Sequence, residues 1–442
     1  MTHGEKKSDG NDRLASPSRR KVLIAGAVAG AALMASGTRA FAAAEDAEIR
    51  VGFIHPMSGA LALFGQCDPY ILSLVRRALT NGLTIRGHHY RVSILDRDSQ
   101  SSPSRATQLA NELVTKNNVQ LMLSTSTAGT VNPVSDVCEA SRVPSLATND
   151  PLEAFFFGRG GKPGHPSPFH WSFDFSFAMQ QFANCYLSMW DKLKTNRKVA
   201  ILYSDSAAGK AFRNGIEPFM RKHGYTIVDP GLYQEGTTSY ASQIALFKRE
   251  KCQIFSTMSN DQDFFTMWRQ AAEQHYNDEV IIAQVAKTGL FPQQITPLGP
   301  LGYNLAGATY WSPKYPYSSP VTGMTSAKLA SGYEKATGRQ WTQQVGASMA
   351  VFDMGIEALK AATNPTDRTS IRDAITNSTF ATTQGPVNFK TGPYPNTSNA
   401  DIIGGQWIMT PKGSRYPIEF VTVGNVNNPK VPIQAKLKPY NA

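Results

Sequence analysis

The chain has 442 residues, of which 41% are hydrophobic and 17% charged. This balance excludes an intrinsically disordered chain, and the length is that of two domains or three small ones. The formal net charge is +11, but the first 42 residues hold seven basic and three acidic side chains and leave +7 for the rest. Because no dense Lys/Arg run with interleaved aromatic residues follows, the charge indicates a basic, solvated surface and no nucleic-acid partner.

The N-terminus combines three features of an export signal. Ser18-Arg19-Arg20-Lys21-Val22-Leu23 is a twin-arginine pattern, and the apolar run from Val22 to Ala35 is about 14 residues long, too short for a bilayer span of roughly 20. Ala40-Phe41-Ala42 then supplies small residues for cleavage, and no lipid-accepting Cys follows the run. Residues 1–42 are therefore predicted to be a Tat signal peptide, cleaved near Ala42, that directs the protein to the periplasm; an uncleaved tail is the alternative.

Cysteine spacing excludes the common thiol motifs. The four cysteines, none of them in a C-x-x-C pair, are Cys67, Cys138, Cys185 and Cys252. A zinc ribbon or a thioredoxin-type site is therefore not expected. The periplasm permits disulfides, so disulfides and buried free thiols both stay open.

Strand and helix patterns alternate after the signal. Strand-like segments at 48–54, 90–95, 119–123 and 143–147 alternate with helical segments at 67–81, 103–118 and 131–141. The helical segment 103–118 places Ala106, Leu109, Ala110 and Leu113 on one face. This βαβ series predicts an α/β domain with a parallel sheet covered on both faces.

A second α/β block follows a break in the pattern. The break is the Gly- and Pro-rich run from Gly158 to Pro166, which can hold neither a helix nor a central strand. Helical segments are then expected at 177–193, 209–223, 240–250 and 261–275, and strands at 198–203, 225–228, 253–258 and 280–283. Two doubly wound parallel-sheet lobes in one chain imply a cleft between them.

Neutral polar residues follow the strands of both blocks. Ligands of such sheets bind beyond the carboxyl ends of the strands. Here those ends lead into Ser58-Gly59, Ser124–Thr127, Thr148-Asn149, Ser204–Ser206 and Ser259–Asp261. Hydroxyl, amide and loop N–H groups of this kind suit the polar end of a small-molecule ligand.

Sequence motifs of enzymes were not found. The chain contains no G-x-x-x-x-G-K-[ST], G-x-S-x-G, H-E-x-x-H or strand-linked G-x-G-x-x-G. Asp96 and Asp98 stand two apart without the glycine of a calcium loop, and a solvated turn explains them better. We therefore expect no catalytic residue, no metal and no cofactor, so the protein is expected to be no enzyme; the alternative is an enzyme whose catalytic groups come from separated loops.

Five segments resemble the type I periplasmic binding proteins of ABC transporters, in that family's order, over roughly residues 48–440. The resemblance is closest to the branched-chain amino acid (Leu/Ile/Val) group. It implies the type I periplasmic binding protein fold, with a hinge of three chain crossings near Phe173, Thr309 and Gly385. The expected lobes are 48–172 with 310–385 and 173–309 with 386–442. The five segments are Met57–Gly65, Leu123–Thr127, Pro144–Pro151, Val199–Gly209 and Gly385–Phe389.

The resemblance implies a set of ligand-binding residues in the first lobe. Phe64 stands where the family packs a ring on the ligand. Ser124, Thr125 and Ser126 match its carboxylate-binding serine loop, whose N–H and hydroxyl groups neutralise an oxyanion. Ala147, Thr148 and Asn149 match the loop that meets the polar end of the ligand.

The second lobe departs from the amino acid binders. Val285, or its neighbour Gln284, stands where that group has an acidic residue for the ligand's ammonium, and Ala208 and Asn260 stand where it has aromatic rings. Because a buried ammonium without a paired charge is costly, the expected ligand is a larger carboxylate without an α-amine, an aromatic one included. Asp205, Asp261 or Asp263 could supply the missing charge, which keeps a branched-chain amino acid or an amide as the alternative.

The resemblance also implies what the protein does. The expected function is ligand capture for an ABC importer, by a monomer that docks on the permease subunits. A periplasmic receptor that senses the same ligand is the alternative of another class. The loop from Leu152 to His170 is longer than the family's and reads as a lid, a transporter contact or a surface excursion packed by its own phenylalanines.

Overall fold

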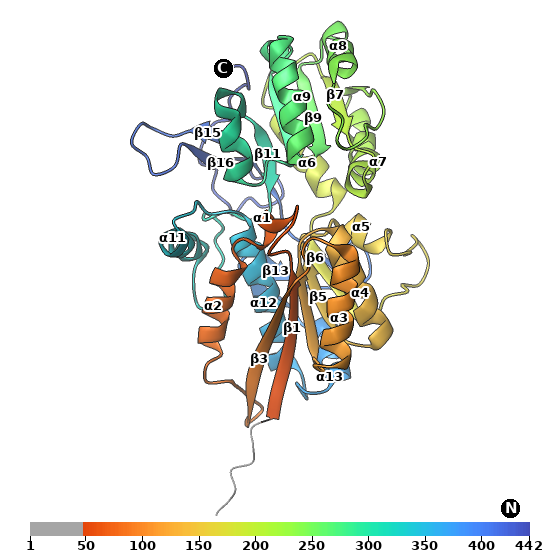
Figure 1. The fold of residues 1–442 in the computed structure, drawn as a ribbon, viewed down its shortest axis with the longest axis vertical. Coiled ribbons are helices and arrows are strands. Elements are labelled where there is room, and N and C mark those ends of the chain that lie inside the picture. The colour runs from red at the N-terminus through yellow and green to blue at the C-terminus, as the bar shows by residue number, and fades with distance from the viewer. Residues whose placement is uncertain (1–46) are drawn as a thin grey trace, which may run out of the picture. The chain divides into compact units, whose positions relative to one another are not determined.

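Two seven-stranded sheets organise the computed structural model, which describes residues 47–442 (Figure 1). The predicted signal peptide, with its cleavage site, lies outside the described residues. Of the helices within 47–442, none is long and apolar enough to cross a membrane.

The first lobe is built on a sheet that is parallel except at one edge. Its order is β14-β6-β5-β4-β1-β3-β2, and only β2 runs antiparallel, against β3. The strands are β1 (Ala47–His55), β2 (Leu83–Ile85), β3 (His88–Asp98), β4 (Leu121–Thr125), β5 (Ser145–Thr148), β6 (Ser172–Ser176) and β14 (Thr397–Asn399).

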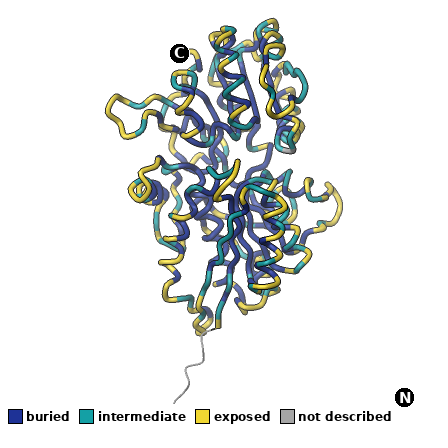
Figure 2. Tube along the Cα trace, in the orientation of Figure 1, coloured by how far each residue is buried: buried dark blue, intermediate teal, exposed yellow. Residues whose placement is uncertain are grey.

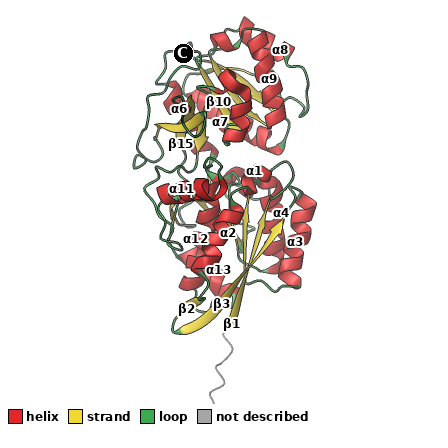
Figure 3. Cartoon of the chain, turned by 60° about the vertical axis from the view of Figure 1, so that its left-hand side comes forward, coloured by secondary structure: helices red, strands yellow, loops and turns green. Residues whose placement is uncertain are grey.

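Helices cover both faces of this sheet, as Figure 3 shows. Strand β4 is buried throughout. Its Leu121 and Leu123 lie in the same hydrophobic cluster as α12, whereas Met122 packs with α3 and α4 on the opposite face. Successive side chains of the strand point to opposite faces of the sheet, and helices cover both faces. The strand therefore reads as a continuous apolar run in the sequence. The helices are α1 (Ala62–Gly65), α2 (Asp68–Ala78), α3 (Pro103–Thr115), α4 (Ala128–Ser141), α5 (Leu152–Phe156), α11 (Ser326–Thr337), α12 (Gln344–Ala361) and α13 (Arg368–Asn377), and β12 (Phe380–Thr382) pairs with β13 (Gly385–Val387) in a hairpin.

The second lobe has the sheet order β16-β15-β11-β10-β9-β7-β8. The pairs of β15 with β11 and β16 are antiparallel and the others parallel. Its strands are β7 (Lys198–Tyr203), β8 (Thr226–Val228), β9 (Ile254–Ser259), β10 (Ile282–Lys287), β11 (Ala306–Thr309), β15 (Ile403–Met409) and β16 (Ile418–Gly424). Its helices are α6 (Met179–Trp190), α7 (Ala207–Lys222), α8 (Ala241–Arg249), α9 (Asp261–Glu273) and α10 (Pro292–Ile295), with 3₁₀ turns at Asn277–Glu279 and Thr296–Gly302.

The chain passes between the lobes three times, after β6, after β11 and after β14. The predicted crossings near Phe173 and Gly385 need correction. Strand β6 continues in the first sheet to Ser176, and β14 pairs with β6 from Thr397 to Asn399. Residues 386–399 therefore belong to the first lobe, and the third crossing lies between Asn399 and Ile403. Figure 2 shows buried chain at the centre of each lobe and exposed chain mostly on the outer loops and helix turns.

All four cysteines are free and buried. Burial raises the pKa of Cys138, Cys185 and Cys252 to about 12, so these thiols stay protonated and unreactive. Within residues 47–442 no three His, Cys, Asp or Glu side chains gather in an arrangement that could hold a metal ion.

Candidate ligand-binding site

A cavity of about 270 Å³ lies where the two lobes face each other. It is slightly smaller than the roughly 300 to 1,000 Å³ typical of small-molecule sites, which suits a compact solute. The carboxyl ends of β4, β5, β9 and β10 surround it, as expected for doubly wound sheets. The lining residues are Phe64, Thr127, Ala128, Gly129, Asn149, Pro151, Ala154, Phe177, Phe182, Ser206, Ala208, Ala211, Glu235, Met258, Ala286, Lys287, Leu290 and Tyr310.

Aromatic rings form one side of the cavity. Phe177 stacks with Tyr310 at 6.1 Å between ring centroids and meets the edge of Phe182 at 4.8 Å. Phe177 and Tyr310 stand at the first and second chain crossings, so the hinge itself contributes this surface. Phe64 is fixed by a T-shaped contact with Phe291 of the second lobe, at 5.1 Å. Rings held in this way offer flat apolar surface to a ligand with little loss of side-chain entropy.

A chain of hydrogen bonds connects two polar lining residues through a buried glutamine. Asn149 Nδ2 donates to Gln344 Oε1 at 2.7 Å, and Gln344 Nε2 donates to the Tyr310 hydroxyl oxygen. Asn149 has a φ of 71°, a left-handed conformation that Asn tolerates better than most residues. Burial raises the pKa of Tyr310, so its hydroxyl keeps the proton and can donate to an acceptor on a ligand.

Two helices begin at the cavity, one from each lobe. Thr127, Ala128 and Gly129 form the start of α4, and the Thr127 side chain makes no capping hydrogen bond there. Ser206 caps α7 by accepting from Gly209 N at 3.2 Å. Because free N–H groups and the helix dipole favour negative charge, this end of the cavity suits an anionic group.

Three of the predicted ligand-binding residues meet on the cavity wall: Phe64, Asn149 and Ala208. Five others lie in the first lobe without lining it. Ser124, Thr125, Ser126, Ala147 and Thr148 are buried, and the chain reaches the cavity only at the following residues, Thr127 and Asn149. The serine loop therefore sits beneath the cavity surface.

The predicted residues of the second lobe have other surroundings. Val285 is buried in the core with Phe255 and Ala283 and does not line the cavity. The next residue, Ala286, lines it instead. Gln284 is also buried and donates to Met189 Sδ at 3.8 Å. Asn260 caps α9 by accepting from Asp263 N at 2.9 Å.

The acidic residues considered as replacements do not line the cavity. Asp263 accepts from Gly236 N and from Asn260 Nδ2, whereas Asp205 is exposed. Asp261 Oδ1 accepts from Gln294 Nε2 at 2.6 Å. Burial raises the pKa of Asp261, and the hydrogen bond from Gln294 and the charge of Lys287 act in the opposite direction.

Sequence reasoning missed several lining residues, of which Lys287 is the most consequential. Phe177 was expected to begin a helix and Tyr310 to follow the second chain crossing, and neither was predicted as a ligand contact. Lys287 ends β10, four residues beyond the end predicted for that strand. The signal that could have found it is the segment Val285-Ala286-Lys287-Thr288-Gly289, where an apolar strand leads into a lysine and a glycine turn.

The two lobes contact each other next to Phe64, a residue that lines the cavity. Gln293 Nε2, on α10 of the second lobe, donates to Oε1 of Gln66, which follows α1 of the first, at 2.8 Å. The rings of Phe64 and Phe291 also contact each other. In the sequence, each of these residues stands two positions before one of the two glutamines. These contacts depend on the approach of the two lobes.

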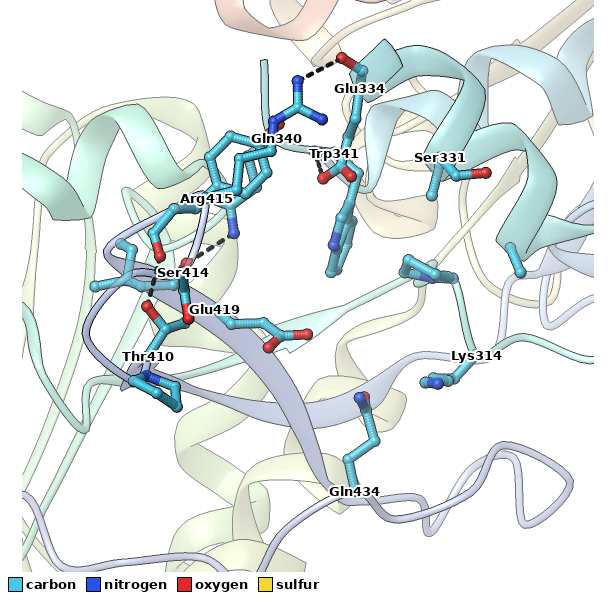
Figure 4. Close-up of a pocket in the computed structure, with 16 residues that line it drawn as sticks. Lys314, Ser331, Glu334, Gln340, Trp341, Thr410, Ser414, Arg415, Glu419 and Gln434 are labelled. Carbon is cyan, nitrogen blue, oxygen red and sulfur yellow. Dashed lines mark hydrogen bonds between the residues drawn. The ribbon is translucent and has the colours of Figure 1, made fainter. Parts of the chain in front are cut away.

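A larger hollow of about 430 Å³ lies between α11 and the β15–β16 hairpin (Figure 4). Arg415 Nη2 of the hairpin donates to Glu334 O of α11 at 2.9 Å, and Gln340 Nε2 donates to Ile418 O at 2.8 Å. Half of its 16 lining residues are exposed, and charges of both signs lie at Lys314, Arg415, Glu334 and Glu419. It contains none of the predicted ligand-binding residues, and we read it as a contact region between hairpin and helix.

The loop from Leu152 to His170 is held against the first lobe by Arg159. The side chain of Arg159 is 1% exposed, and its guanidinium lies 4.6 Å from the Phe155 ring centroid and 4.2 Å from that of Phe169. Its Nε donates to Asp136 Oδ1 at 2.7 Å and its Nη2 to Ser172 Oγ at 3.0 Å. This packing matches a surface excursion held by its own phenylalanines; only Ala154 of the loop reaches the cavity.

The fold and the interlobe cavity are those of a two-lobed binding protein, and comparison with known proteins gives the family. The model of the family described as periplasmic binding protein matches residues 48–400. The chain belongs to the periplasmic binding protein family. The Leu/Ile/Val-binding protein homolog 8 of Brucella suis biovar 1 (strain 1330) is 24% identical over 411 residues, which cover 87% of this chain and 93% of that protein.

Solved structures share the fold at low sequence identity. A solute-binding protein of an ABC transporter from Rhodopseudomonas palustris BisB5, in complex with 3,4-dihydroxybenzoic acid, superposes with a TM-score of 0.67 at 18% identity, covering 86% of this chain and 99% of that one. A leucine-binding protein from Thermotoga maritima MSB8 gives the same TM-score and coverage at 16% identity. A solute-binding protein from Rhodopseudomonas palustris HaA2, in complex with p-hydroxybenzoic acid, also gives 0.67 at 17% identity, covering 89% and 98%.

Proposed function

We propose that this protein is the periplasmic substrate-binding component of an ABC importer and that it captures a compact organic carboxylate without an α-amino group. The observation that carries the proposal is the composition of the cavity wall: aromatic and aliphatic residues, with the Asn149 and Tyr310 polar groups beside the start of α4. Family membership supports the transport role.

The ring-lined cavity favours an aromatic acid over an aliphatic amino acid. An α-amino acid carries an ammonium that needs a carboxylate partner when it leaves water. Of the described residues that line the cavity, Glu235 alone is acidic, and it is exposed. Two of the structural neighbours were crystallised with hydroxybenzoic acids, which agrees with this choice.

Export follows from the same role. The twin-arginine segment and the small-residue cleavage site of residues 1–42 support Tat-dependent delivery to the periplasm, where the closed, ligand-bound form would dock on the permease subunits.

A thermal-shift screen of the purified mature chain tests the ligand class. The panel is benzoate, 4-hydroxybenzoate, short dicarboxylates, amides, urea and the branched-chain amino acids. A ligand at 100 times its dissociation constant adds about 2.7 kcal/mol of stability, which gives a clear shift. We expect the largest shift from an aromatic acid. The largest shift from leucine, isoleucine or valine would overturn the proposed ligand class.

A further inference from the structure

Of the described residues that line the cavity, two carry a formal charge, Lys287 and Glu235. Glu235 is exposed, whereas Lys287 is partly buried at the carboxyl end of β10. A charge that is partly removed from water acts more strongly on a ligand than one at the solvent surface. Lys287 is therefore the group whose charge bears most on what the cavity accepts.

The backbone holds Lys287 in a strained conformation. Its φ is 67°, in the left-handed region that a residue with a Cβ rarely adopts. The turn after it is fixed: Thr288 Oγ1 donates to Ser259 O at 2.8 Å, and Thr288 N donates to Ala286 O at 2.8 Å. At Gly289 a Cβ would lie 2.5 Å from Val285 Cγ2, so the turn packs tightly on the strand. Strain of this kind persists where the surroundings fix it and is common at ligand sites.

The ammonium of Lys287 keeps hydrogen-bonding capacity. Within residues 47–442 its Nζ forms no hydrogen bond and no ion pair, and its charge acts on Asp261. The Oδ1 atom of Asp261 already accepts from Gln294 Nε2 at 2.6 Å. An ammonium has three N–H donors, so Lys287 can bind an anionic group within the cavity.

We propose that Lys287 is the specificity-determining residue of the site: its ammonium binds the carboxylate of the ligand, and the ring of the ligand packs among Phe177, Phe182 and Tyr310. This inference rests on the proposed function and deepens it. The second lobe thus carries a positive charge near the position where the amino acid binders are expected to carry a negative one. A carboxylate without an α-amine gains from that charge, whereas the ammonium of an amino acid is repelled by it.

Calorimetric titration of four forms of the mature chain tests the inference: wild type, Lys287→Met, Lys287→Arg and Lys222→Met. Methionine keeps the length of the side chain without its charge, and arginine keeps the charge. Lys222 ends α7, is exposed and does not line the cavity, so Lys222→Met controls for net charge. The probes are benzoate and its neutral analogue benzamide.

A hydrogen bond to a charged group is worth about 1.5–3 kcal/mol, so Lys287→Met should weaken benzoate binding about 10- to 150-fold. Benzamide binding should change less than about threefold, and Lys287→Arg and Lys222→Met should stay within about fivefold of wild type for benzoate. Equal benzoate affinity of Lys287→Met and wild type would overturn the role of Lys287 and leave the proposed function intact. A wild-type chain that binds leucine and no aromatic acid would overturn both.

Discussion

Removal of the hydrogen bond between Gln66 and Gln293 should weaken ligand binding although neither residue lines the cavity. The bond joins the two lobes with 2.8 Å between Gln293 Nε2 and Gln66 Oε1. If the lobes separate when the ligand leaves, the bond exists only in the closed form, and its loss lowers the closed population.

The size of the effect follows from the kind of bond. A neutral hydrogen bond contributes a net 0.5–1.5 kcal/mol, which corresponds to about a 2- to 10-fold rise in Kd for Gln293→Ala. Because the bond is exposed, we expect the lower part of this range. The rise should appear mainly in the dissociation rate.

Calorimetry and stopped-flow fluorescence of Gln293→Ala, Gln66→Ala and the double variant measure the coupling. Either single change removes the whole bond, so the double variant should be no weaker than the singles. Gln262→Ala is the control, because Gln262 is exposed on α9 and does not line the cavity. Single variants with wild-type affinity, or effects that add in the double variant, would refute a closed form held by this bond.

Three further predictions concern stability and the thiols. Gly346→Ala should destabilise the protein by about 1–3 kcal/mol, because the new Cβ would lie 2.1 Å from Cγ of the buried Trp311. Gly129→Ala is the control: its Cβ would meet only Thr127 Oγ1, at 3.9 Å, so this variant should unfold no earlier than wild type. Burial raises the pKa of Asp353 from 3.8 to about 8, so the folded state keeps a proton that the unfolded chain releases, and stability should fall as pH rises from about 4 to about 8. In Asp353→Asn, denaturant melts should lose that part of the pH dependence; an unchanged slope would contradict the assignment. A thiol reagent should modify none of the four buried cysteines in the native protein and all four after denaturation, and a lower count in the denatured, unreduced chain would reveal a disulfide.

Local sequence patterns predicted the alternation of strands and helices. They missed the short strands whose positions depend on pairing with a strand elsewhere in the chain. Buried strands such as β4 and amphipathic helices such as α3 each carry their own period. The three-residue strands β2 and β14 have no such signal, because their positions are set by pairing with β3 and β6. The resemblance placed the third crossing near Gly385, before β14, whereas β14 still pairs with β6 in the first sheet.

Three residues named by similarity to the family line the cavity, and Lys287, which also lines it, was not among those named. Asn149 lines the cavity directly after β5, Ala208 lines it from the first turn of α7, and Phe64 lines it from the short helix α1. Strand β10 was predicted to end at Ala283, and the resemblance placed the acidic position of the amino acid binders at Val285 or Gln284. The strand continues to Lys287, and with this shift Val285 becomes a core residue and the lysine reaches the cavity.

The division of the lining between the lobes bears on how binding would drive closure. The first lobe contributes Phe64, Asn149 and the start of α4, and the second contributes Phe182 and Lys287. A ligand can favour the closed form only through contacts that the open form lacks. If the carboxylate binds Lys287 and the ring packs on Phe182, Phe177 and Tyr310, closure depends on the remaining contacts with the first lobe, such as those with Asn149. A charged ligand too small to reach Asn149 would then bind the second lobe without closing the site. Acetate should therefore compete weakly with benzoate and leave the contact between Gln66 and Gln293 unformed, whereas benzoate should promote it.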